Sequence, residues 1–197
     1  MPNSIFYIAL IGYWLLFYGH ILINPFKIAS SEILEYDFPI MRLAGECWKK
    51  GHLPHDEYYY DDFVGVRPML LYPINILCSY IIASVNLDLS FKILVYNVLF
   101  HNLFTSIFAY YLFGQGLIGL FGALAWGYCG YHIQQSITRT QGFCWLTATL
   151  LAITTGHFIW AGVCLGMMIL CANPPYTLYF CYFISGYYII KSLFQCS

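Results

Sequence analysis

The chain has 197 residues, of which 60% are hydrophobic, 20% are aromatic and only 9% are charged, and its mean hydropathy is +0.68. A soluble domain carries about 25% charged residues because water must wet its surface, so most of this surface is expected to face lipid. The formal net charge is −1 and no basic stripe is present, so we expect no nucleic-acid partner. The composition predicts an all-α fold, a polytopic bundle with about six or seven transmembrane spans.

The charges divide the chain into three parts. Positions 25–68 hold 5 of the 8 basic residues and 8 of the 9 acidic ones. We therefore expect a first transmembrane helix at 1–24, a polar loop at 25–68 and a transmembrane helix bundle at 69–197. Of the eight cysteines, only Cys47 lies in the polar loop, and none has CxxC spacing. We interpret the others as small apolar side chains, not as disulfides or metal ligands.

The first helix is predicted at 4–24, where an apolar run is long enough to cross about 30 Å of hydrocarbon. It lacks the basic start and cleavage site of a signal peptide, which indicates a retained helix that ends before Pro25. In the loop, Ser30 or Ser31 can cap a short helix through Trp48 that would lie in the membrane interface. Gly51 is expected to end it.

The apolar segment 69–87 is short and carries Pro73 near its start, and it decides the topology. If it crosses the bilayer, a later polar cluster falls on the opposite side from the first loop. If it only dips in, the cluster shares the side of the loop, and we favour this arrangement. The cluster comprises His132, Gln134, Gln135, Arg139 and Gln141.

The remaining spans are predicted at 91–113, 117–133, 143–155, 158–172 and 176–194. His20 and His101 lie within apolar helices, where we expect them to be packed or hydrogen-bonded to neighbouring helices. Glycines favour close helix packing, and we interpret the GxxxG pair Gly162 and Gly166 in this way. The glycines are Gly12, Gly19, Gly119, Gly122, Gly127, Gly130, Gly162 and Gly166. No hydrolase, zinc-protease or nucleotide-binding motif is present in the sequence.

Several short motifs, in order along nearly the whole chain, resemble the N-terminal part of the YfhO family of bacterial polytopic membrane proteins. These motifs are Asp37 after the first helix, the run from Gly51 to Pro54, Gly65 with Pro68, the run from Tyr72 to Leu77, Gly122 to Ala125 followed by Gly130 and Tyr131, and Asn173 with Pro174. The family is placed with the GT-C glycosyltransferases, which take sugars from polyprenyl-phosphate carriers. Its members are several times longer, so the resemblance implies a natural truncation, a fragment of a split gene or a remnant.

The resemblance implies a site in the first loop, at the extracytoplasmic face of the cytoplasmic (inner) membrane. Asp37 matches the acidic residue that GT-C enzymes place there, and Glu35 is its helper or alternative. Proton transfer needs such a carboxylate, and positive charge must stabilise the departing phosphate. The candidate phosphate-binding residues are Arg42, Arg67 and Arg139, the last beside His132 and Gln141. Asp61 and Asp62, with Asp56 and Glu57, are candidate ligands for a divalent cation.

Simpler interpretations stand beside these. The acidic residues can be solvated, and Arg139 can extend to the interface because a charge at central bilayer depth costs roughly 2.5–3.5 kcal/mol. The leading hypothesis is a GT-C-related protein, complete or remnant, acting on a polyprenyl-phosphate-linked sugar. One alternative is a non-catalytic membrane subunit that docks to a partner protein. A transporter is the second alternative, against which few ionisable residues lie in the later helices.

Overall fold

The computed structural model describes residues 3–28, 33–54, 68–127, 137–171 and 174–195. Every regular element in these ranges is a helix, which confirms the all-α prediction for the described residues. The elements are α1 (Asn3–Ile23), the short η1 (Pro25–Ile28) and η2 (Ile33–Asp37), α2 (Phe38–Lys49), α3 (Pro68–Leu71), α4 (Pro73–Ile82), α5 (Leu87–Leu112), α6 (Gly116–Gly127), α8 (Ile137–Thr154), α9 (Phe158–Cys171) and α10 (Pro174–Gln195).

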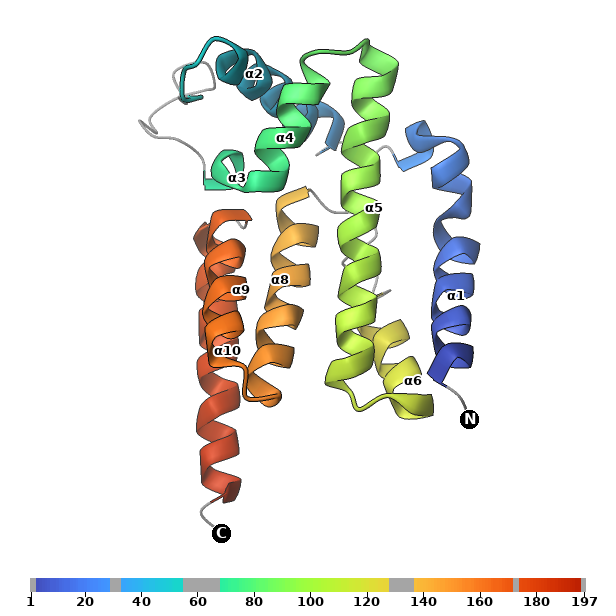
Figure 1. Cartoon of the computed structure of the whole chain (residues 1–197), viewed down its shortest axis with the longest axis vertical. Coiled ribbons are helices and arrows are strands. Elements are labelled where there is room, and N and C mark those ends of the chain that lie inside the picture. Colours follow the sequence, from blue (N-terminus) through green and yellow to red (C-terminus); the bar gives the residue numbers. More distant parts are fainter. Residues whose placement is uncertain (1–2, 29–32, 55–67, 128–136, 172–173, 196–197) are drawn as a thin grey trace.

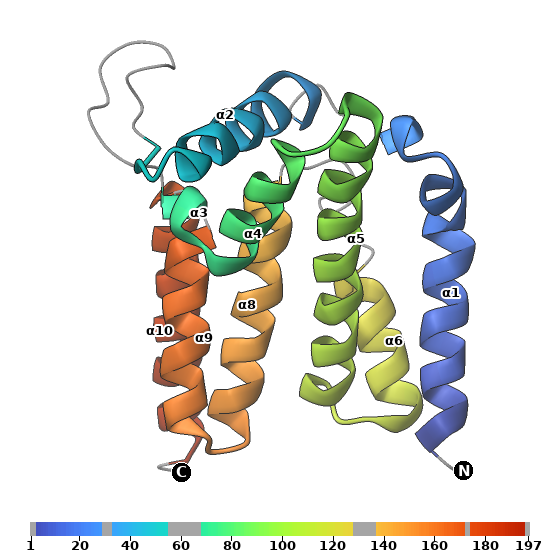
Figure 2. The ribbon, with the colours of Figure 1, turned by 45° about the horizontal axis from the view of Figure 1, so that its top comes forward.

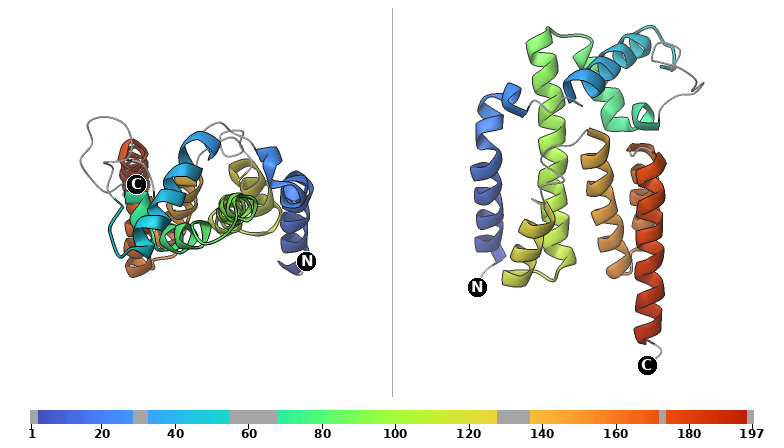
Figure 3. Two further views of the ribbon diagram at one scale, coloured as in Figure 1. Left: turned by 90° about the horizontal axis from the view of Figure 1, so that it is seen from above. Right: turned by 180° about the vertical axis from the view of Figure 1, so that it is seen from behind.

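The helices form an upright bundle with a crosspiece at one end (Figure 1). Helices α1, α5, α6, α8, α9 and α10 run side by side, and consecutive members point in opposite directions along the bundle (Figure 2). Helix α2 lies across one end, above α3 and α4, and Figure 3 shows this arrangement from above and from behind. We call this end the α2 end; both chain termini lie toward the opposite end.

Two of these helices are long and apolar enough to cross a membrane, Ser4–Ile23 and Leu87–Leu112. The first presents large apolar side chains outward, with Ile8 70%, Leu16 84% and Ile23 87% exposed. Water would not favour such a surface, whereas lipid would. The described structure therefore agrees with membrane association.

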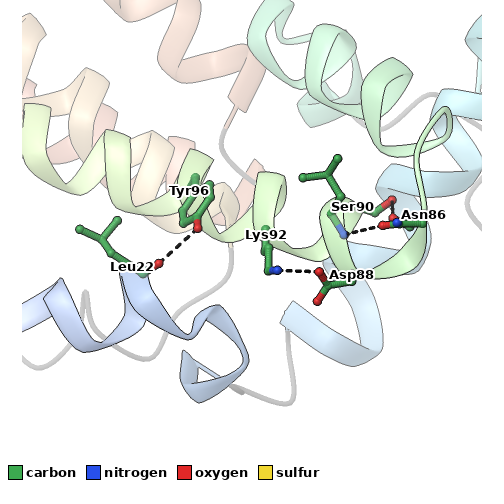
Figure 4. Close-up of polar contacts among 7 residues, drawn as sticks. Leu22, Asn86, Asp88, Ser90, Lys92 and Tyr96 are labelled. Carbon is green, nitrogen blue, oxygen red and sulfur yellow. Dashed lines mark hydrogen bonds and ion pairs between the residues drawn. The ribbon is translucent and has the colours of Figure 1, made fainter.

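Local sequence explains where α5 begins. The Asn86 side chain accepts a hydrogen bond of 2.9 Å from the Leu89 N–H, which caps the helix, and Lys92 pairs with Asp88 at 2.5 Å one turn further on (Figure 4). The Tyr96 hydroxyl donates to the Leu22 carbonyl at 3.2 Å and joins α5 to α1 (Figure 4). The start of α5 is thus fixed both within the helix and against its neighbour.

The segment 69–87 is not one helix, and it is broken where the sequence places Pro73. Tyr72 has extended backbone angles (φ −66°, ψ 123°) and separates α3 from α4. Pro73 explains this break because its ring disfavours helical angles at the preceding residue. Helix α4 has 10 residues, about 15 Å, which is too short to cross a bilayer of about 30 Å. Within the described chain, segment 69–87 therefore holds no helix long enough to cross by itself, and the side on which the polar cluster lies stays a prediction.

Helix α8 begins at Ile137, six residues before the predicted start at 143. The predicted start was too late because the span was taken from the apolar run alone, which follows the polar residues Arg139 and Gln141. Thr140 and Gln141 are instead 1% and 0% exposed within the helix, and Arg139 is half-buried. Helix α5 likewise begins at Leu87, four residues before the predicted position 91.

The glycines fall into two groups. A Cβ at Gly45, in the middle of α2, would overlap the Ser79 carbonyl oxygen of α4, and a Cβ at Gly119 would lie 2.7 Å from the Tyr110 carbonyl oxygen. Gly122 and Gly127 are equally crowded, as predicted. A Cβ at Gly12, Gly19, Gly162 or Gly166 would meet nothing within 4 Å. The packing interpretation of the GxxxG pair is therefore wrong within the described chain, because no other described element covers it.

Candidate functional site

Asp37 is the most buried acidic side chain described, with 4% exposure, and it precedes the first residue of α2. The following residue, Phe38, packs edge-on against Phe91 of α5 at 5.9 Å between ring centroids. Asp37 is also the last residue of η2 and has helical backbone angles, so η2 runs directly into α2 and the Asp37 side chain does not cap it. The helper candidate Glu35, on the same short helix, is exposed. The structure thus separates the two acidic candidates by burial.

The basic candidates lie on different elements. Arg42 is half-buried on α2, and Arg139 is half-buried in the first turn of α8. Arg67, His132, Asp61 and Asp62 lie outside the described residues, so the structure gives no geometry for the proposed phosphate and cation contacts there. In the described part of the chain, no group of three His, Cys, Asp or Glu side chains is placed to hold a metal ion.

Gln141 forms a reciprocal amide pair with Asn75 of α4. The Asn75 Nδ2 donates to Gln141 Oε1 at 2.9 Å, and the Gln141 Nε2 donates to Asn75 Oδ1 at 2.6 Å. Both side chains are 0% exposed. The sequence-predicted role of Gln141 in binding substrate stays a prediction; in this structure its amide joins α8 to α4.

A third amide completes what we call the amide cluster, Asn75, Asn97 and Gln141. The Asn97 Nδ2, on α5, donates to Asn75 Oδ1 at 3.2 Å. The Asn75 Nδ2 also donates to the Met69 carbonyl of α3 at 3.0 Å. That carbonyl lies just before the break at Tyr72, where the helical hydrogen bonds are interrupted. Asn75 therefore replaces a lost backbone bond and ties α4 to α3, α5 and α8.

A second set of side chains, which we call the Tyr72 chain, lies beside the amide cluster. Trp145 Nε1 of α8 donates to the Tyr72 hydroxyl at 2.8 Å, and that hydroxyl lies 3.0 Å from His101 Nε2 of α5. His101 Nδ1 lies 2.8 Å from the Asn97 carbonyl, which can only accept. Nδ1 must therefore carry the proton, so Nε2 accepts from Tyr72.

The Tyr72 chain is consistent with a neutral tyrosine. Tyr72 is 0% exposed, and its hydroxyl has a donor in Trp145 and an acceptor in His101. The hydroxyl thus keeps its proton and can donate to His101. The expectation that His101 is hydrogen-bonded to a neighbouring helix is confirmed. His20, by contrast, is exposed on α1.

The sequence analysis singled out Gln141 but missed its partners. Asn75 and Tyr72 entered only as parts of a motif, and Asn97 and Trp145 were read as ordinary members of apolar segments. One signal could have found them: on α5, Ser90, Asn97, His101 and Thr105 recur at helical spacing and mark a polar face within an apolar helix. All four are buried in the structure.

Comparisons with known proteins add no further identification. Neither the family models nor the curated proteins nor the solved structures include a match to this chain.

Proposed function

We propose that the chain is a polytopic membrane protein in which α1, α5, α6, α8, α9 and α10 cross the bilayer. The two helices that pass the length and apolarity test support this, as do the large apolar side chains exposed on α1, α9 and α10. Most of the charged residues described also gather at the α2 end, on or beside η1, η2, α2 and the first two turns of α5, with Arg139 of α8 and Lys191 of α10 as the exceptions. Helix α2 would then lie at the membrane interface.

We further propose that the α2 end binds the phosphate and sugar of a polyprenyl-phosphate-linked donor, as in a GT-C-like glycosyltransferase. The observation that carries this proposal is the burial of Asp37 at the start of α2. Buried carboxylates are uncommon because burial of a charge must be compensated by partners, and ionisable groups in such surroundings concentrate at functional sites. Asp37 would take the proton of the acceptor hydroxyl while Arg42 and Arg139 stabilise the departing phosphate.

A transfer assay with matched variants tests the reaction. The purified chain would be reconstituted in vesicles with polyprenyl-phosphate sugars, and Asp37→Asn would be compared with Glu35→Gln on the same short helix. We expect Asp37→Asn to abolish transfer and Glu35→Gln to retain most of it, because only Asp37 is buried. Full transfer by a folded Asp37→Asn protein would remove the catalytic assignment.

A second candidate is a non-catalytic membrane subunit whose α2 end faces the cytoplasm and docks to a partner protein. It is favoured by the basic residues, since cytoplasmic ends of membrane proteins are enriched in Lys and Arg. Five of the seven described Lys and Arg residues lie at the α2 end, Lys27, Arg42, Lys49, Lys50 and Lys92, whereas Arg139 begins α8 below α3 and α4 and Lys191 lies toward the other end. This orientation is opposite to the one that the resemblance implies.

Labelling in intact cells separates the two candidates. A single cysteine in place of exposed Lys50 would be treated with a membrane-impermeant thiol reagent, in a background without the native cysteines. Labelling from outside supports the glycosyltransferase orientation. Labelling only after the cells are opened places the α2 end in the cytoplasm, and the docking subunit then becomes the better account. Gln141 is unsuitable as a reporter because it is fully buried.

A further inference from the structure

The break between α3 and α4 lies part-way along the bundle, beyond the first turns of α5 as counted from the α2 end. Helix α5 has 26 residues, about 39 Å, so a hydrocarbon layer of about 30 Å measured back from Leu112 reaches roughly Lys92. The hydrogen bond from Tyr72 to His101 places the break about 17 Å from Leu112 along α5. The interruption in the helix is therefore at membrane depth under the proposed placement.

Helix α9 supports the same placement. It has 14 residues, about 21 Å, and falls roughly 9 Å short of the hydrocarbon thickness. Helix α3 packs against α9 at the α2 end, where the missing length would be. The α3–α4 segment thus enters the layer and leaves on the same side. Irregular backbone at this depth is tolerated only where protein buries it or a polar cavity hydrates it.

Protein groups satisfy the buried side-chain polar atoms of the amide cluster and of Tyr72, with one exception. Asn75 Oδ1 accepts from both Gln141 and Asn97, and Gln141 Oε1 accepts from Asn75. The Tyr72 hydroxyl donates to His101 and accepts from Trp145. One acceptor is left: none of the described residues donates a hydrogen bond to Asn97 Oδ1. Asn97 is 6% exposed, so bulk water does not supply the missing donor either.

We propose that the break between α3 and α4 is a binding site for an O–H donor, which hydrogen-bonds to Asn97 Oδ1. A buried acceptor without a donor is costly, whereas an ordered hydroxyl would satisfy it. A metal cation fits poorly, because hard cations take six or more oxygen ligands and the other side-chain oxygens of the amide cluster are already engaged. A neutral hydroxyl fits this single acceptor: a trapped water, or the hydroxyl of a polar ligand that enters from the α2 end.

A crystal structure from lipid, at a resolution that shows ordered water, tests the inference directly. We expect non-protein density within hydrogen-bond distance of Asn97 Oδ1. Compact density at one position would identify water, and extended density would identify a hydroxyl-bearing ligand. Absence of density, with the Asn97 amide in the orientation described, would overturn the proposal.

A variant provides the control. Asn97→Leu keeps a side chain of similar size and removes the acceptor, so the density should disappear while the Asn75–Gln141 pair remains. Density that persists in a folded Asn97→Leu protein would show that Asn97 does not hold the group. The inference rests on the proposed membrane placement and not on sugar transfer. An inactive transferase with density at Asn97, or an active one without it, would therefore separate the two proposals.

Discussion

Two regions of the molecule are both rich in apolar residues but are packed differently. One is the interior where α4, α5 and α8 meet, and the other is the outer faces of α1, α9 and α10. In the interior, amide and hydroxyl side chains bond across helices, and Gly45 allows α2 to approach α4 closely. On the outer faces, large side chains such as Ile159 at 86% exposure alternate with glycines that touch nothing. In lipid, apolar surface alone does not drive helices together, so packing and hydrogen bonds must specify the interior.

The largest expected loss of stability comes from blocking the close packing of α2 against α4. Gly45→Ala would place a methyl group on the Ser79 carbonyl, and backbone cannot move aside as a flexible side chain can. We expect a loss of about 3 kcal/mol in the free energy of unfolding, or no folded protein at all. Unfolding in mixed detergent micelles measures this.

The matched control for that substitution lies on an outer face. Gly166→Ala adds the same methyl group to α9 where nothing lies within 4 Å, and alanine favours the helix, so stability should rise by roughly 0.5–1 kcal/mol. A large loss at Gly166 would mean that another chain covers this face. Comparing the stability changes at Gly45 and Gly166 therefore shows which of the two helix surfaces is closely packed.

The amide pair should show the next largest effect. Gln141→Leu leaves the Asn75 amide buried with fewer partners, which costs about 1–3 kcal/mol, and Asn75→Leu should cost at least as much because it also releases the Met69 carbonyl. The double variant should lose less than the sum, by about 1 kcal/mol. A double-mutant cycle of unfolding free energies measures the coupling. Strictly additive losses would show that the pair is not formed in the membrane.

A smaller effect is expected from the Tyr72 chain. Tyr72→Phe removes the hydroxyl between Trp145 and His101 without changing the ring, and we expect a loss of about 1–2 kcal/mol. Tyr182→Phe is the control on α10, where the ring is 66% exposed and the change should be near zero. Thermal unfolding of both variants in the same detergent makes the comparison. Equal shifts would contradict the distinction between interior and outer face.

The smallest effect concerns the exposed ion pair at the start of α5. Asp88→Asn breaks the ion pair with Lys92. The Asp88 side chain is 55% exposed and the Lys92 side chain is 34% exposed. Such helical pairs contribute about 0.3–0.5 kcal/mol, and salt screens them. We expect the difference between variant and parent to vanish in high salt. A larger, salt-independent loss would mean that Asp88 has a role beyond this pair.

The helical class and most helix positions could be predicted because apolar runs, prolines and glycines mark them directly. The start of α8 could not, since Thr140 and Gln141 look like a connector until their buried partners are known. The break at Tyr72 was visible as Pro73, but its repair by Asn75 depends on contacts far along the chain. For the candidate site, Asp37 stood out through the resemblance. Its burial could not be foreseen, because a carboxylate in a charged loop is ordinarily solvated.

The pairing of Asn75 with Gln141 also imposes an order on biosynthesis. The two residues are 66 positions apart, so at about 5–20 residues per second the ribosome makes the partner of Asn75 some 3–13 s later. Until then the α3–α4 segment has no α8 beneath it and can rest near the lipid surface. Helices α5 and α6, joined by three residues, can pair at once. Under the proposed membrane placement, the α3–α4 segment is thus expected to be among the last of the described parts of the molecule to settle.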